Sequence, residues 1–132
     1  MNALRRTLYL QAAVWGLVGA ALAVAPRLVL VSLFGQPPLN EPAWVRLLGI
    51  HAVAVAMLMV LVAHRIEDLW WWAWGFCLVT AGVAVVTLIN AAFGLAPGEP
   101  ATLWWVFAGV TSAFAFALLY GLAVTATQNP IQ

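Results

Sequence analysis

Charged residues are scarce in this chain. Only 7% of its 132 residues are Asp, Glu, Lys or Arg, lysine is absent, and 66% of the residues are hydrophobic. A soluble domain usually has about 25% charged residues, so this composition excludes a soluble globular protein and predicts an integral membrane protein. The formal net charge is only +1, so we expect no nucleic-acid partner.

Cysteine, histidine and catalytic motifs are scarce as well. The single cysteine, Cys77, excludes an intramolecular disulfide, and with only two histidines beside it we expect no zinc site. The chain has no G-x-S-x-G, P-loop, G-x-G-x-x-G, C-x-x-C or H-E-x-x-H motif. We therefore expect no catalytic residues and a protein that is not an enzyme.

Long apolar runs occupy most of the chain. A transmembrane helix needs about 20 apolar residues, and four such runs are separated by short segments that contain proline or charge. The predicted spans cover residues 8–25, 44–64, 69–93 and 101–126. The expected fold is all-α, a bundle of four transmembrane helices that forms a single integral membrane domain over residues 1–132.

The segments between the spans are short. The first run ends at an Ala-x-Ala triplet, as a secretory signal does, but Pro26 directly after it disfavours cleavage, so we expect the helix to remain. Proline lacks an N–H donor and ends this span. Residues 28–34 are too short to cross a bilayer and are expected to form an interfacial helix at the membrane surface. Residues 36–42 and 94–100 are predicted to be loops, and residues 127–132 a polar tail.

Small residues recur at helical spacing within the spans. Lipid tails are as apolar as leucine, so helices in a bilayer gain most where small residues allow close backbone contact. The fourth span has a stripe at four-residue spacing: Gly109, Ala113, Ala117 and Gly121. We expect this stripe to pack against the first span through Gly16 and Ala20, with another subunit as the alternative. Further small residues in the first three spans are Ala12, Gly19, Ala23, Ala52, Ala56, Gly75 and Gly82.

His51 is the one ionisable side chain that we place inside a span. Ionisable residues within a membrane are candidates for function, so we expect its imidazole to face protein or a ligand and not lipid. If the second and third spans are antiparallel neighbours, Asn90 lies at the same depth, and Arg46 is about one turn above His51. The candidate ligand site is therefore Arg46, His51 and Asn90, for a quinone, a pigment such as a carotenoid or haem, or a lipid. A histidine that only makes one helix-to-helix hydrogen bond is the alternative.

Arginine distribution predicts the orientation. With the N-terminus inside, Arg5, Arg6 and Arg65 are cytoplasmic, and Arg27 and Arg46 are outside. This arrangement agrees with the positive-inside rule. Both termini are then expected in the cytoplasm.

The order of these features is similar to that of a known family. Pro26 closes the first span, a short segment ends at Phe34-Gly35, and the second span opens with Trp44-Val45-Arg46-Leu47-Leu48-Gly49, which contains an R-x-x-G signature. This pattern resembles the DoxX-like group of small four-helix bacterial membrane proteins. The resemblance implies the bacterial cytoplasmic membrane and an accessory or quinone-associated role, and it supplies no catalytic residues.

Two classes of function agree with these features. The expected function is a non-enzymatic accessory or structural subunit of a larger membrane complex or of a homo-oligomer. The alternative is a binder or redox partner of an apolar small molecule, namely a quinone, a carotenoid or a lipid. A transporter or channel is disfavoured because the spans lack aligned polar faces.

Overall fold

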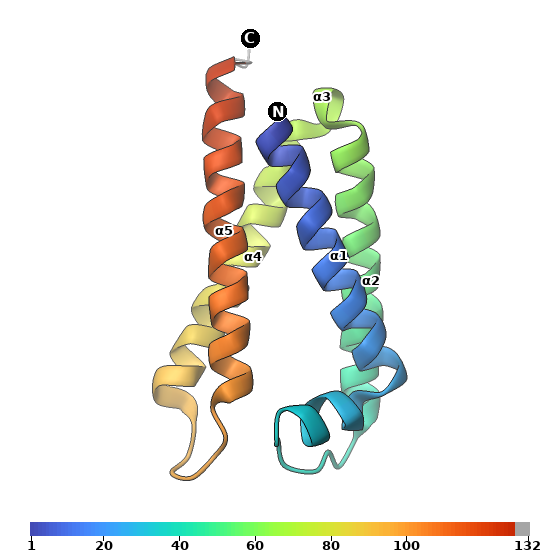
Figure 1. Ribbon diagram of the computed structural model, residues 1–132, viewed down its shortest axis with the longest axis vertical. Helices are drawn as coiled ribbons and strands as arrows, with labels where there is room; N and C mark the ends of the chain where they lie inside the picture. Colours follow the sequence, from blue (N-terminus) through green and yellow to red (C-terminus); the bar gives the residue numbers. More distant parts are fainter. Residues whose placement is uncertain (129–132) are drawn as a thin grey trace.

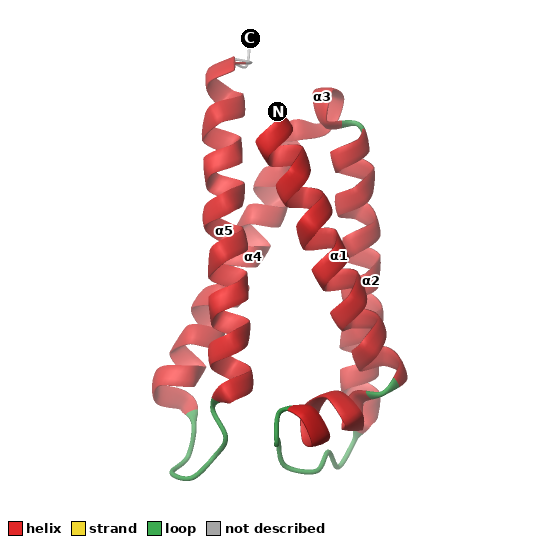
Figure 2. Ribbon diagram, viewed as in Figure 1, coloured by secondary structure: helices red, strands yellow, loops and turns green. Residues whose placement is uncertain are grey.

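The computed structural model describes residues 1–128, and every regular element in that range is helical (Figure 2). Four helices are long and apolar enough to cross a membrane, and they cover Asn2–Val24, Pro42–His64, Ile66–Gly94 and Thr102–Gln128. The all-α fold with four such helices is therefore confirmed. Residues 129–132, the end of the predicted polar tail, lie outside the described residues.

The long helices are joined by short irregular or tightened segments. α1 (Asn2–Val24) leads through a π-helical segment, η1 (Leu28–Leu33), and a loop to α2 (Pro42–His64). The third long helix consists of α3 (Ile66–Leu69), η2 (Trp70–Trp72), α4 (Ala73–Ile89) and η3 (Asn90–Gly94), and a turn connects it to α5 (Thr102–Gln128). α1 begins at Asn2 and not at residue 8, because arginine is as good a helix former as most apolar residues.

Proline and glycine determine where the helices stop. Pro26 follows the last residues of α1, and Pro42 is in the first turn of α2, where its missing N–H costs no hydrogen bond. Gly35 comes shortly after η1 with φ +63°, and Gly98 has φ +86° in the turn before α5. Glycine adopts positive φ without the penalty of a side chain, so both loops reverse the chain at these residues.

α1 and α2 form the most closely packed pair. A Cβ atom on Gly19 would lie 2.7 Å from the Gly49 carbonyl oxygen, and one on Gly49 would lie 2.5 Å from the Gly19 carbonyl oxygen. The two backbones therefore touch here, and a Cβ atom on Gly16 would lie 3.6 Å from the methyl group of Ala56. Small residues thus mark a helix contact as predicted, but Gly16 contacts α2 and not α5.

The bundle consists of two helix pairs that are joined at one end. α4 packs on α5, and the two pairs meet mainly through α1 and α5 (Figure 1). The core lies toward the end that holds Met1 and Gln128, and its largest fully buried apolar side chains are Leu4, Leu8, Met59, Ile66, Leu118 and Leu122. Farther from this end, Trp15 of α1 stacks on Phe107 and meets Phe114 edge-on, with ring centroids 6.2 and 6.0 Å apart.

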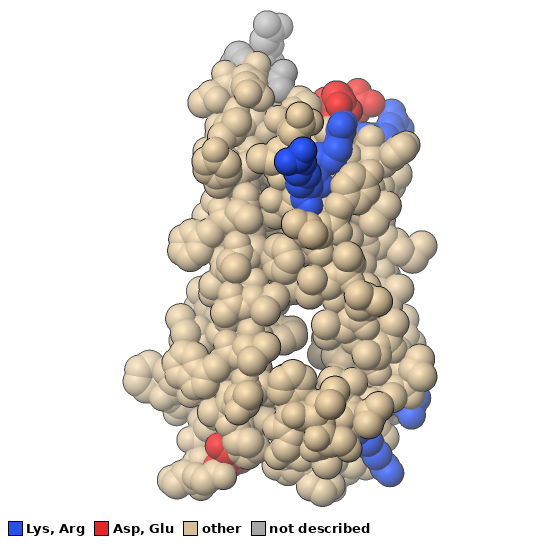
Figure 3. Space-filling model, in the orientation of Figure 1, with Lys and Arg blue, Asp and Glu red and all other residues tan. Residues whose placement is uncertain are grey.

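The pairs separate toward the end with the loops. In the space-filling view an opening passes through the molecule between the two pairs, above the segment that contains η1 (Figure 3). Gln36 and Pro100, one from each loop, are joined by a hydrogen bond of 3.2 Å. The molecule therefore has a packed end at Met1 and Gln128 and an open end at the loops.

The small-residue stripe of α5 does not face one partner. Gly121 packs against Leu4 of α1, but Gly109 and Ala113 are exposed, and a Cβ atom on Gly109 would meet nothing within 4 Å. Four residues exceed one helical turn by about 40°, so three such steps rotate the stripe by about 120° around the helix. The predicted contact along the whole stripe with Gly16 and Ala20 is therefore wrong, and Ala20 is itself exposed.

The glycines of the third long helix do not mark contacts either. Gly75 and Gly82 are exposed, and added Cβ atoms would meet nothing within 4 Å. The side of α4 that is buried carries instead Cys77, Thr80, Ala84 and Thr87.

Candidate functional site

Arg46 supports the end of α1 in this structure. Its Nη1 atom donates to the carbonyl oxygens of Ala23 at 3.0 Å and Val24 at 3.4 Å. The last carbonyl groups of a helix have no partner within the helix and carry partial negative charge. A guanidinium group from α2 thus caps α1.

His51 lies on the outer side of α2 and is exposed. Its Nδ1 atom is 2.8 Å from the carbonyl oxygen of Leu47, one turn earlier in the same helix. A carbonyl oxygen can only accept, so Nδ1 donates this hydrogen bond, and in the neutral imidazole Nε2 is then an acceptor. Arg46 and His51 are five residues apart, which is about 140° around the helix, so the two side chains leave α2 in different directions.

Asn90 is separated from both of these residues. α2 and α4 are joined by a sharp corner at Arg65 but then diverge, because α2 packs on α1 while α4 packs on α5 (Figure 1). The expected antiparallel neighbours are therefore not neighbours along their length. Asn90 begins η3 at the open end, where it lines a pocket that contains neither Arg46 nor His51.

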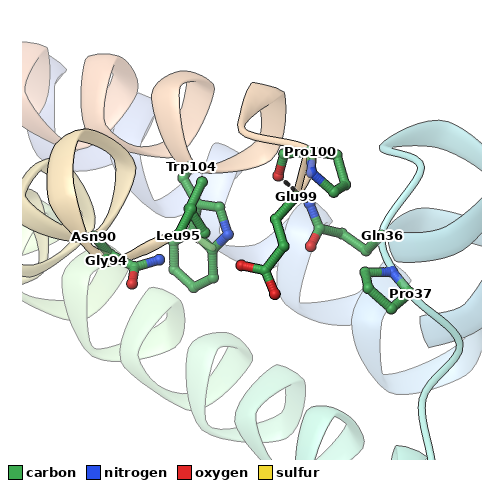
Figure 4. Close-up of a pocket in the computed structure, with 8 residues that line it drawn as sticks. All are labelled: Gln36, Pro37, Asn90, Gly94, Leu95, Glu99, Pro100 and Trp104. Carbon is green, nitrogen blue, oxygen red and sulfur yellow. Dashed lines mark hydrogen bonds between the residues drawn. The ribbon is translucent and has the colours of Figure 1, made fainter. Parts of the chain in front are cut away.

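This pocket lies between the two end loops (Figure 4). It has a volume of about 250 Å³ and is open on one side. Its lining consists of Gln36, Pro37, Asn90, Gly94, Leu95, Glu99, Pro100 and Trp104. We call it the loop pocket. Of the three predicted ligand-binding residues, only Asn90 belongs to it.

Local hydrogen bonds hold two polar side chains of the loop pocket, Glu99 and Gln36, in place. Glu99 reaches back across its turn, and its Oε2 atom accepts a hydrogen bond of 2.8 Å from the backbone N–H of Ala96. Gln36 donates from Nε2 to Pro100, and the Asn90 amide oxygen lies directly against Gly94. In the close-up, the nitrogen-bearing edge of the Trp104 indole is drawn on the side of the Glu99 carboxylate (Figure 4). The pocket therefore combines one carboxylate, two amide groups and an aromatic ring.

Sequence reasoning missed Gln36, Glu99 and Trp104 as partners in a site. Gln36 and Glu99 come from two loops that are more than 50 residues apart in the chain, and Trp104 comes from the first turn of α5. No local spacing connects Gln36 with the other two residues. A carboxylate inside an otherwise uncharged Pro-Gly turn was the available signal.

The sequence also contained no sign that Gln11 and Thr80 form a buried hydrogen-bonded pair. Gln11 of α1 is fully buried, and its Nε2 atom donates to the Thr80 hydroxyl of α4 at 2.7 Å. The hydroxyl in turn donates to the carbonyl oxygen of Phe76 at 2.6 Å. The Oε1 atom of Gln11 has no hydrogen-bond partner among residues 1–128.

Within the described residues, no three His, Cys, Asp or Glu side chains come together in a way that could hold a metal ion. The loop pocket offers a single carboxylate, which suits a cationic organic group better than a metal ion with several ligands. Comparison of the chain with family models, with curated proteins and with solved structures found no match.

Proposed function

We propose that this protein is a non-enzymatic subunit of a bacterial cytoplasmic membrane assembly. The partner is a transmembrane helix that covers the outer face of α2 and donates a hydrogen bond to His51. The observation that carries the proposal is the exposed His51 on a span, with its Nε2 atom left as an acceptor. The similarity to the DoxX-like group supports the same kind of role.

The surroundings of His51 support a protein partner. Leu47 lies four residues before His51 and Leu58 lies seven residues after it, so both share its side of the helix. They are 46% and 54% exposed. A polar side chain in hydrocarbon is costly, and lipid tails offer no hydrogen-bond donor. The small Ala54 beside His51 would let a second helix approach closely. A partner helix with a hydroxyl or amide donor would remove the cost and bury this apolar face.

The proposed orientation places the packed end in the cytoplasm. Met1 donates to the Gln128 side chain at 3.3 Å, so the start of α1 and the end of α5 share one end (Figure 1). Arg5, Arg6 and Arg65 belong to this end, and Arg27 and Arg46 belong to the other, which agrees with the positive-inside rule. In this arrangement η1 is an interfacial helix at the external surface of the cytoplasmic membrane.

The experiment compares His51→Leu with the parent protein in a mild detergent. We expect the parent to purify as an assembly with another membrane protein or with further copies of itself, and His51→Leu to release that partner. Leu58→Ile on the same face conserves volume and should leave the assembly intact. His64→Leu, at the end of α2, controls for the loss of a histidine.

A lipid-facing His51 would give the opposite result. His51→Leu would then raise thermal stability, because leucine is the better residue in hydrocarbon, and it would leave the particle size unchanged. If a quinone or pigment co-purifies with the parent and is lost with His51→Leu, the partner of His51 is an apolar small molecule and not a helix.

A further inference from the structure

We infer that the loop pocket binds the ammonium head group of a membrane phospholipid, with phosphatidylethanolamine as the chemical type. The inference rests on the proposed placement of the long helices across a bilayer. It is independent of the partner proposed for α2.

Charge is the first argument. Glu99 is the only charged residue in the lining of the loop pocket, and no arginine takes part in it. One oxygen of its carboxylate is held by the N–H of Ala96, and the other makes no hydrogen bond to any residue of the described range. A fixed carboxylate without a basic neighbour attracts a cation, and a primary ammonium group can donate three hydrogen bonds to it and to nearby amide oxygens.

The aromatic ring is the second argument. The Trp104 indole and the Glu99 carboxylate both line the loop pocket (Figure 4). The face of a tryptophan ring attracts an ammonium group more strongly than any other aromatic side chain does. Tryptophan also favours the membrane interface, where phospholipid head groups lie. Glu99 and Trp104 together therefore select for a cationic head group at that depth.

The size and position of the pocket are the third argument. A water molecule takes about 30 Å³ of liquid volume, so the cavity of about 250 Å³ has room for an aminoethyl group. The pocket lies between the same two helix pairs that leave an opening through the molecule (Figure 3). A phospholipid whose head group occupies the pocket can therefore lay its acyl chains along the apolar helices. A free amine has no acyl chains and cannot make these additional contacts.

The test measures lipid retention by the full chain. We would purify the protein in a mild detergent, add phosphatidylethanolamine or phosphatidylglycerol of identical acyl chains, and measure bound lipid by native mass spectrometry. We expect phosphatidylethanolamine to be preferred and Glu99→Gln to lower its retention about tenfold, as for a lost hydrogen bond to a charged group. Glutamine can still accept from the N–H of Ala96, so this variant preserves the turn.

Two further variants sharpen the test. Glu41→Gln removes a carboxylate at the same end of the molecule but outside the loop pocket, and it should retain lipid like the parent. Trp104→Leu keeps the charge but removes the aromatic face, and it should weaken retention of phosphatidylethanolamine without a gain for phosphatidylglycerol.

The inference is overturned if Glu99→Gln retains phosphatidylethanolamine like the parent or if both lipids bind equally well. Displacement of the lipid by free ethanolamine at an equal concentration would overturn the assignment to a lipid. Carbonate extraction of cell membranes tests the membrane placement separately, because an integral protein stays in the pellet whatever its lipid preference.

Discussion

Arg5 and Arg46 hold α1 at its two ends. Arg5 forms an ion pair with Glu67 of α3 and donates from Nε to the carbonyl oxygen of Ala63 at 3.2 Å. Arg46 caps the last carbonyl groups of α1. Both arginines therefore join α1 to the α2–α3 region by contacts with backbone carbonyls, and Arg46 has a supporting role beside the predicted ligand-binding one.

The first prediction concerns this cap. Arg46→Met should lower the free energy of unfolding by about 0.3 to 1 kcal/mol, the usual value of a cation near a helix C-terminus. Arg27→Met, which removes an exposed arginine at the same end of the molecule, is the control and should have a smaller effect. Thermal unfolding in detergent measures both, and equal shifts would contradict the capping role.

The second prediction concerns the buried Gln11–Thr80 hydrogen bond, whose two ends should respond with opposite signs. Thr80→Val should destabilise the protein by about 1 to 3 kcal/mol, because it leaves the whole Gln11 amide buried without a partner. Gln11→Met should be neutral or stabilising, because it removes a buried oxygen that already lacks a hydrogen-bond partner. Thr80 keeps its hydrogen bond to the carbonyl oxygen of Phe76. If both variants lose stability equally in thermal unfolding, a water molecule or ligand occupies the site of Oε1.

At the scale of the helices, small residues matter only where two backbones meet. The contact between Gly19 and Gly49 is such a place, and the exposed part of α5 around Gly109 is not. A Cβ atom added to Gly19 or to Gly49 would lie less than 3 Å from the backbone of the opposing helix. Even an alanine at either position would therefore force the two helices apart.

The third prediction compares matched substitutions. Gly49→Ala should lower the unfolding temperature, because its methyl group would overlap the carbonyl oxygen of Gly19. Gly109→Ala should be neutral or raise stability by up to about 1 kcal/mol, the difference in helix propensity between the two residues. Thermal unfolding of the two variants in the same detergent is the measurement, and a loss of stability in Gly109→Ala would mean that a neighbour covers that face.

The helices could be predicted from the sequence better than their contacts. Apolar runs of about 20 residues fix where long helices form, and Pro26 and Pro42 fix two of the breaks. The spacing of Gly109 to Gly121 indicates small residues but not the direction in which they face, because the stripe rotates around α5. The loop pocket could not be predicted, because Gln36 and Glu99 meet only through the arrangement of both helix pairs.

At the scale of the whole molecule, the two ends differ in how they are held. At the packed end, Arg5 pairs with Glu67 and Met1 donates a hydrogen bond to Gln128, close to the apolar core. At the other end the hydrogen bond from Gln36 to Pro100 joins the two loops. Fewer buried apolar contacts and more exposed hydrogen bonds make a region open at lower free energy.

The fourth prediction follows from this difference. In hydrogen–deuterium exchange, backbone amides of residues 95–101 should exchange faster than those of residues 60–66, which adjoin the core. Gln36→Leu should speed the exchange of residues 95–101 further and leave the unfolding temperature almost unchanged. Equal exchange at the two ends in the parent protein would contradict the picture of one packed and one open end.

The contact between Gly19 and Gly49 also bears on how the protein is made. All residues of this contact are contained in the first 64 of the chain, and neither α4 nor α5 contributes to it. Domains and their parts form in the order in which the ribosome releases them, from the N-terminus. The α1–α2 hairpin can therefore close while α4 and α5 are still being synthesised, and it then offers Trp15 and Leu4 as a ready surface for α5.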